Sequence, residues 1–321
     1  MTDRRPAASS PAASSPAGPG GDAPGDRSAS RRLPDLGPWP LRALWLLLPL
    51  TVGGALDALL DGRSGSLVAT AAVLAWAAWA ASLLATLVAH PVSLTVLRVA
   101  GPAAAVLAVG AAAIGRPSLP VAVASVAVGL AAGALAVSAG TADRCVDGVS
   151  YGSERRLALR IPTPLLAGPL PLAWLAIVVG GAAGPLLLGA QRWVPGGVAL
   201  VVGWPAAAFA ARSLHGLSRR FIVLVPAGFV LHDRAALLDP VLFSRHAMAH
   251  IGPALADTDA TDLTLGAAGL VIEVRLVQPL DVPRRRGRRD ASMDTVDAVL
   301  FSPARPGRLL QLAADHDLPI G

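Results

Sequence analysis

Ionisable residues are almost absent from six long apolar stretches between Leu41 and Ala211, and this absence constrains the fold more than any other feature. The stretches cover residues 41–60, 66–89, 93–114, 118–140, 170–190 and 196–211. A helix needs about 20 apolar residues to cross the roughly 30 Å hydrocarbon core of a bilayer. The first five stretches reach that length, and the sixth is shorter and contains Pro205. We therefore predict an α-helical polytopic membrane protein with about six transmembrane helices within residues 39–212.

The composition supports this prediction and argues against several classes of site. Apolar residues make up 54% of the chain and charged residues 15%, whereas soluble domains have about 45–50% and about 25%. All 27 basic residues are arginine, which together with the many Ala, Gly and Pro residues indicates a GC-rich bacterial genome. The pI of about 11.1 is therefore weak evidence for nucleic-acid binding, and we expect no nucleic-acid partner. A single cysteine, Cys145, excludes an intrachain disulfide and a cysteine-based metal site.

The distribution of arginine predicts the orientation in the membrane. The net charge of +6 lies in residues 1–212, with 15 Arg and 9 acidic residues, because residues 213–321 have 12 of each. The connections between the stretches fall alternately on the two sides of the membrane, and those on one side contain only Arg63, Arg116 and Arg192. Twelve lie on the other side: Arg27, Arg31, Arg32, Arg42, Arg98, Arg144, Arg155, Arg156, Arg160, Arg212, Arg219 and Arg220. The positive-inside rule then predicts a multi-pass protein of the plasma (inner) membrane with both termini in the cytoplasm.

Two segments beside the apolar stretches have their own character. Residues 1–38 are rich in Ala, Ser, Pro, Gly, Asp and Arg, and such a segment buries too little apolar surface to order, so we predict a disordered N-terminal tail. The cytoplasmic loop 141–169 contains an alternating stretch, residues 155–161, which favours a strand or a segment at the membrane interface. We hypothesise that this stretch docks on the C-terminal domain.

Residues 213–321 predict a cytoplasmic β-rich domain. Seven short strands are expected at 221–225, 229–232, 240–243, 247–251, 261–265, 270–277 and 296–301, and residues 303–315 predict a final amphipathic helix. The turn Pro226-Ala227-Gly228 joins the first two strands, and Gly266 to Gly269 joins a second hairpin, 261–265 with 270–277.

This order of seven strands and a C-terminal helix resembles a pleckstrin-homology-like (PH-like) fold, and the segment RRFIVLVPAGFVLHD (residues 219–233) resembles the opening hairpin of bacterial PH-like domains. The resemblance covers the last third of the chain. The whole chain resembles the uncharacterised multi-pass membrane proteins of GC-rich Gram-positive bacteria. A different small β-barrel or α+β domain remains the alternative.

The sharpest candidate site is the basic loop 278–292. Its five arginines are candidate ligands for anionic lipid headgroups, because guanidinium groups match phosphate in geometry: Arg284, Arg285, Arg286, Arg288 and Arg289. The alternative is a solvated, disordered loop.

No metal, cofactor or catalytic site is predicted elsewhere. His246 and His250 are four residues apart, as helical metal ligands are, but no third ligand follows at helical spacing. The acidic loop from Asp257 to Asp262 lacks the glycine and glutamate of a calcium loop. Asp57, near the end of its apolar stretch, predicts an interfacial carboxylate.

Three functional classes remain. The favoured class is a non-enzymatic integral membrane protein that presents a PH-like module to anionic lipid or a protein partner. The alternative is a small-molecule or ion transporter or channel, for which Gly184-Pro185 offers a helix break; a lipid-modifying enzyme is the third. Two GxxxG patterns, Gly129–Gly133 and Gly180–Gly184, predict close helix packing within the protomer or in a homo-oligomer.

Overall fold

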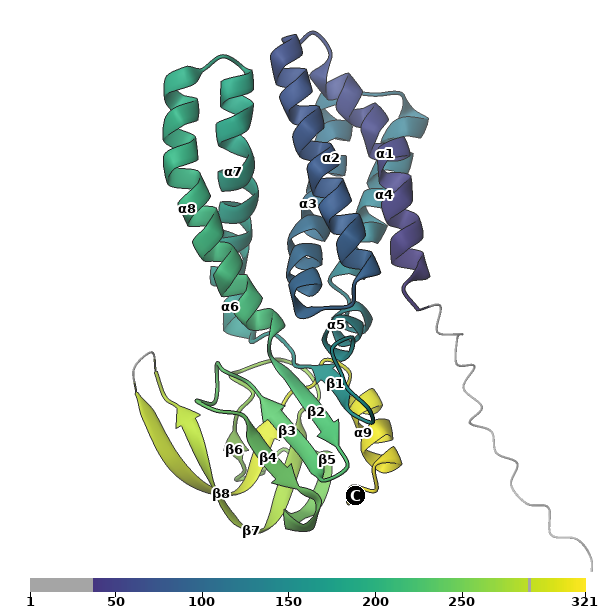
Figure 1. Ribbon diagram of the computed structural model, residues 1–321. Helices are drawn as coiled ribbons and strands as arrows, with labels where there is room; N and C mark the ends of the chain where they lie inside the picture. Colours follow the sequence, from purple (N-terminus) through teal and green to yellow (C-terminus); the bar gives the residue numbers. More distant parts are fainter. Residues whose placement is uncertain (1–36, 288–289) are drawn as a thin grey trace, which may run out of the picture. The chain divides into compact units, whose positions relative to one another are not determined.

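The computed structural model describes residues 37–287 and 290–321. Nearly all of the predicted disordered tail, residues 1–38, lies outside the described residues, as do Arg288 and Arg289. In the described part, six helices are long and apolar enough to cross a membrane, and they fit an integral membrane protein (Figure 1). They are α1 (Trp39–Leu60), α2 (Gly65–Leu87), α3 (Pro91–Gly115), α4 (Leu119–Ala136), α7 (Pro169–Gly189) and α8 (Trp193–Ser218).

Two helix boundaries differ from the prediction. The apolar stretch 118–140 is one helix only as far as Ala136, and a separate short helix, α5 (Ala139–Asp147), follows it. The side chain of Ser138 accepts a hydrogen bond from the backbone N–H of Thr141 and so caps the new helix. The sixth membrane helix is longer than predicted, because α8 continues to Ser218 and joins the first strand after it through only Arg219 and Arg220.

Tryptophan and arginine side chains satisfy backbone carbonyl groups that the apolar helices leave free. Pro49 has no N–H for the carbonyl of Trp45, four residues earlier, and the indole N–H of Trp79 donates to that carbonyl at 2.8 Å. Arg42 donates from Nε and Nη2 to the carbonyl of Thr86, near the end of α2, at 3.2 and 3.1 Å. A cation is favourable there because the carbonyl end of a helix carries partial negative charge.

Small residues bring two helix pairs close together, as the GxxxG patterns predict. Gly129 and Gly133 of α4 lie against α3, where a side chain on Gly129 would collide with Ala108. Gly180 of α7 lies against the backbone of Gly203 in α8, while Gly184 lies against the side chain of Leu200. Both patterns therefore pack helices within one protomer.

The strands form two four-stranded sheets in the described part of the chain. The first has the order β1-β2-β3-β4 and the second the order β5-β7-β8-β6. Their bounds are β1 (Arg155–Ala158), β2 (Phe221–Val225), β3 (Gly228–His232), β4 (Val241–Ser244), β5 (Met248–Pro253), β6 (Thr261–Asp262), β7 (Ile272–Arg285) and β8 (Ala291–Phe301). We call the two sheets, with the final helix α9 (Pro306–Asp315), the sheet region.

The loop between α4 and α7 supplies the first strand of the sheet region. β1 pairs antiparallel with β2, and the backbone N–H of Arg160 donates to the carbonyl of Ser302 at 2.8 Å. The hypothesis that residues 155–161 dock on the C-terminal domain is therefore confirmed. The docked strand adds to the predicted seven and ties the membrane part to the sheet region at a second point besides α8. After it come the short helix α6 (Thr163–Ala167) and then α7.

The predicted second hairpin is wrong. β6 is only two residues long and pairs parallel with β8, with Thr261 beside Val299, instead of antiparallel with β7. β7 runs on to Arg285 and pairs with β8, so the predicted loop 278–292 is mostly a β-hairpin. Pro279 lies inside β7, where the ladder shifts its register between Arg275 and Leu280 and the missing N–H of proline is tolerated.

One apolar core fills the space between the two sheets and α9. Ile222 and Phe229 come from the first sheet, Val274 and Phe301 from the second, and Leu309 from α9, and all are buried. The rings of Phe229 and Phe243 stack with centroids 4.9 Å apart. The predicted final helix and its apolar face are confirmed.

Candidate functional site

A buried ion pair marks the point where the last membrane helix enters the sheet region. Arg220 precedes β2 and Asp233 follows β3, and the register pairs Phe221 with His232. The two side chains therefore meet: Nε and Nη2 of Arg220 donate to the two carboxylate oxygens of Asp233 at 2.7 and 2.6 Å. Nη1 donates to the carbonyl of Arg160 at 3.0 Å, so the guanidinium also holds the docked loop. A fork-to-fork pair of this kind is a strong charge-assisted hydrogen bond.

The backbone around this ion pair also holds the arginine-rich end of the β7–β8 hairpin. The backbone N–H of Arg285 donates to the carbonyl of Ala236 at 2.8 Å, and that of Leu238 donates to the carbonyl of Pro283 at 3.0 Å. Ala236 lies three residues beyond Asp233, which contacts Arg220 directly. The arginines at the end of β7 therefore lie at the end of the sheet region that α8 enters.

We call residues 284–294 the arginine hairpin, and one of its own carboxylates, Asp294, neutralises part of its charge. Nη1 of Arg284 donates to Oδ2 of Asp294 at 3.2 Å, and Nη2 of Arg286 donates to the same oxygen at 2.9 Å. A hydrogen bond from the hydroxyl of Ser292, together with the two arginines, lowers the pKa of Asp294 below its usual range. The sequence prediction counted the arginines and missed Asp294, which the hairpin register brings beside them.

The arginine hairpin nevertheless presents basic and apolar groups to its surroundings. Arg286 is 62% exposed despite its ion pair, and Met293 is 68% exposed. Nε of Arg285 is buried without a hydrogen-bond partner. Among the predicted lipid ligands, the structure brings Arg284 and Arg286 together at Asp294, while Arg285 follows Arg284 in β7.

No protein-family model, curated protein or solved structure matches the chain significantly. The interpretation of the arginine hairpin therefore depends on its own geometry.

The other sequence candidates do not form a site in the described residues. His246 lies in the 3-10 turn Arg245–Ala247 and His250 in β5, so they do not share a helix face. No group of three or more metal-ligating side chains occurs among the described residues. Oδ1 of Asp262 accepts a hydrogen bond from the N–H of Thr264, as in a polar turn. Asp57 is exposed in the last turn of α1, consistent with an interfacial carboxylate.

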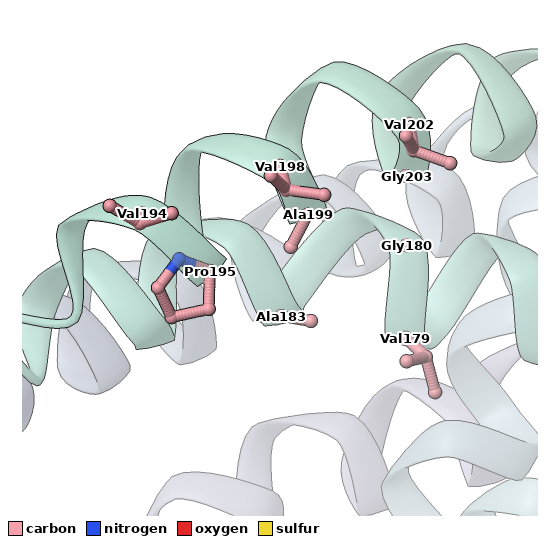
Figure 2. Close-up of a pocket in the computed structure, with 9 residues that line it drawn as sticks. All are labelled: Val179, Gly180, Ala183, Val194, Pro195, Val198, Ala199, Val202 and Gly203. Atoms are coloured by element: carbon pink, nitrogen blue, oxygen red, sulfur yellow. The ribbon is translucent and has the colours of Figure 1, made fainter.

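An apolar groove of about 530 Å³ runs between α7 and α8, and Figure 2 shows the residues that line it. They are Val179, Gly180, Ala183, Val194, Pro195, Val198, Ala199, Val202 and Gly203. Ligand sites combine apolar walls with a few polar groups that fix orientation, and this lining has no polar side chain. The groove belongs to the apolar surface of two membrane helices.

A buried carboxylate in α5 connects the membrane helices to the docked strand. Oδ1 of Asp143 accepts a hydrogen bond from the backbone N–H of Ala158 at 2.9 Å. Its other oxygen, Oδ2, is buried without a hydrogen bond and lies 3.9 Å from Nη1 of Arg305. Burial raises the pKa of Asp143 to about 6, although the bond from Ala158 and the charge of Arg305 act in the opposite direction. No local sequence pattern marks Asp143, because its partners Ala158 and Arg305 lie 15 residues away or more.

Substituting Asp143 with asparagine is expected to remove a pH dependence of stability. The folded protein keeps this proton up to a pH of about 6, whereas the unfolded chain loses it near 3.8. Between those values the folded state binds more protons, so its stability falls as the pH rises, by roughly 3 kcal/mol in total. In thermal unfolding in detergent from pH 4 to pH 7, the stability of Asp143→Asn relative to the wild type should increase as the pH rises. Asp315→Asn, at an exposed carboxylate, is the control; parallel curves for Asp143→Asn and the wild type would contradict the prediction.

Proposed function

We propose that the chain is a non-enzymatic, multi-pass protein of the plasma (inner) membrane whose sheet region binds anionic lipid headgroups through the arginine hairpin. The observation that carries the proposal is the hydrogen bond from Arg285 to Ala236, three residues from the ion pair at the foot of α8. Since α8 enters the sheet region through only two residues, arginines at that end lie within reach of the headgroups. Each arginine near an anionic surface contributes about 1 kcal/mol.

The proposed orientation has both termini in the cytoplasm. The connections carrying Arg63, Arg116 and Arg192 lie at one end of the membrane helices, while α8 enters the sheet region at the other. The second end has the excess of arginine, which the positive-inside rule places in the cytoplasm, where anionic lipids also lie.

A PH-like module is the proposed identity of the sheet region. Three features support it: the β2–β3 hairpin at the resembling segment, two packed four-stranded sheets, and the closing helix α9. The short β6, parallel to β8, and the docked β1 are departures from the expected seven-strand order.

A fluorescent label at position 293 tests the proposal in the full-length protein. Cys145 is buried and can be replaced by serine, so Met293→Cys gives one accessible thiol. In vesicles containing phosphatidylglycerol, we expect a blue-shifted emission and slower quenching by iodide than in pure phosphatidylcholine. Added salt should reduce the difference, because it screens charge. Glutamine at positions 284, 285, 286, 288 and 289 should abolish it.

Two further variants sharpen this test. Asp294→Asn frees Arg284 and Arg286 from their carboxylate and should increase the response to phosphatidylglycerol. Ala227→Cys places the label in the β2–β3 turn, at the opposite end of the strands from Arg220, and should show no response. Equal emission from position 293 in both lipids would refute headgroup binding and favour a protein partner for this surface.

A further inference from the structure

A second polar cluster lies between α3 and α8, at the end where α8 meets the sheet region. Oγ1 of Thr95 lies 3.0 Å from Nδ1 of His215 and 3.0 Å from Oγ of Ser218. Nη1 of Arg98 donates to the same Ser218 hydroxyl at 3.3 Å. Ser218 is buried, and the other three residues are half-buried. We call these four residues the α3–α8 cluster.

The α3–α8 cluster contains a cation without an anion. A guanidinium has five N–H donors, and the described structure gives Arg98 a single acceptor, a neutral hydroxyl. Among the described residues no carboxylate forms an ion pair with Arg98, and its side-chain hydrogen bond goes to Ser218. Arg220 adds positive charge, and both oxygens of the nearby Asp233 are already bound to Arg220.

Arg42 shows how the same chain satisfies an arginine in an apolar helix. Its guanidinium donates two hydrogen bonds to the carbonyl of Thr86 and lies 5.2 Å from the ring of Trp39. Arg98 lies over no aromatic ring among the described residues, and it meets the last residue of α8 only through the neutral hydroxyl of Ser218. A half-buried charge that lacks an opposite charge is unfavourable, so an anion at this position would stabilise the fold.

The position of Arg98 determines which anions can reach it. The residue lies seven positions into α3, or about 10 Å from the start of the helix at 1.5 Å per residue. Its side chain extends back toward the helix start and contacts the last residue of α8. The guanidinium therefore lies near the headgroup level, where phosphate groups are the abundant anions.

We propose that the α3–α8 cluster binds a phosphate group, with the free N–H groups of Arg98 as its main donors. Guanidinium pairs with phosphate oxygens through two parallel hydrogen bonds, and the hydroxyl of Thr95 and the imidazole of His215 border the same space. The phosphate belongs to an anionic lipid or to a soluble phosphate. The site shares no residue with the arginine hairpin, so it does not depend on the function proposed above.

Native mass spectrometry of the delipidated full-length protein tests this site. All samples carry the five glutamine substitutions in the arginine hairpin, so that remaining lipid binding comes from elsewhere. Phosphatidylglycerol should bind the parent protein at one strong site, and Arg98→Gln should weaken that binding by about tenfold to a hundredfold. Arg212→Gln removes an exposed arginine of α8 that makes no side-chain hydrogen bond in the described structure, and should leave the affinity unchanged. Competition by inorganic phosphate would identify a soluble source, and its absence a lipid source.

Two results would overturn the proposal: equal binding of phosphatidylglycerol by the parent and Arg98→Gln, or equal binding of phosphatidylcholine and phosphatidylglycerol by the parent. Arg98→Lys covers the case in which Arg98→Gln does not fold. Lysine keeps the charge but lacks the two parallel N–H donors of a guanidinium. A reduced affinity of Arg98→Lys for phosphatidylglycerol therefore supports the site, and an unchanged affinity refutes it.

Discussion

Replacing Asp233 with alanine is expected to lower the free energy of unfolding of the sheet region by about 3–5 kcal/mol, because it leaves Arg220 charged and buried without its partner. Both side chains are almost fully inaccessible, with exposed fractions of 3% and 1%. The docked loop that carries β1 should also be destabilised, since the same guanidinium donates to the carbonyl of Arg160. Hydrogen exchange should accelerate in β1, β2 and β3, and the protein should unfold at a lower temperature in detergent.

Asp239→Ala is the matched control for this variant. Asp239 is an exposed aspartate six residues further along the chain, and its loss should change stability by less than about 0.5 kcal/mol. The double variant Arg220→Met, Asp233→Leu removes both charges and should recover much of the lost stability, because apolar residues of similar volume can replace a buried pair. Equal unfolding temperatures for Asp233→Ala and Asp239→Ala would show that the pair contributes little.

The membrane helices were predictable because their signal is local. An apolar segment of about 20 residues has few alternatives in a bilayer, where each backbone polar group must bond within its own helix. The β2–β3 hairpin was equally accessible, since Pro226-Ala227-Gly228 marks the turn. A side chain on Gly228 would collide with the carbonyl of Phe243, and its φ of +146° favours glycine.

The ion pair of Arg220 and Asp233 was also within reach of sequence reasoning, although it was not predicted. A hairpin folded about residues 226–227 brings positions 220 and 233 opposite each other, and these positions hold opposite charges. Both charged residues lie in the segment 219–233, but the resemblance to PH-like domains used only its apolar pattern and its turn.

The candidate site depended on long-range pairing, which no local pattern records. The parallel contact of β6 with β8 joins residues 38 positions apart, and the contact of Arg285 with Ala236 joins residues 49 positions apart. The prediction that residues 278–292 form a loop was wrong for residues 278–285 and 291–292, which lie in β7 and β8 although Pro279 and Pro283 are typical of loops. For the same reason Asp294 was not recognised as a partner of Arg284 and Arg286.

Leucine at position 180 is expected to separate α7 from α8, whereas leucine at position 181 is expected to be tolerated. A Cβ atom on Gly180 would lie 2.7 Å from the carbonyl oxygen of Gly203, and one on Gly203 would lie 2.8 Å from the carbonyl oxygen of Gly180. Neither obstacle is a flexible side chain, so the two backbones must move apart. No heavy atom lies within 4 Å of a Cβ at Gly181 among the described residues.

The two variants have the same composition and differ by one position in one helix, so each is the control for the other. Overpacking costs about 1–3 kcal/mol and more where backbone blocks the new atoms, so we expect Gly180→Leu to lose about 3 kcal/mol. Gly181→Leu should be neutral or slightly stabilising, since leucine favours helix over glycine by close to 1 kcal/mol. Thermal unfolding of both variants in the same detergent measures the difference, and crosslinking between cysteines introduced on α7 and α8 reports the separation. Equal losses would mean that the α7–α8 contact does not depend on the backbone approach at Gly180 and Gly203.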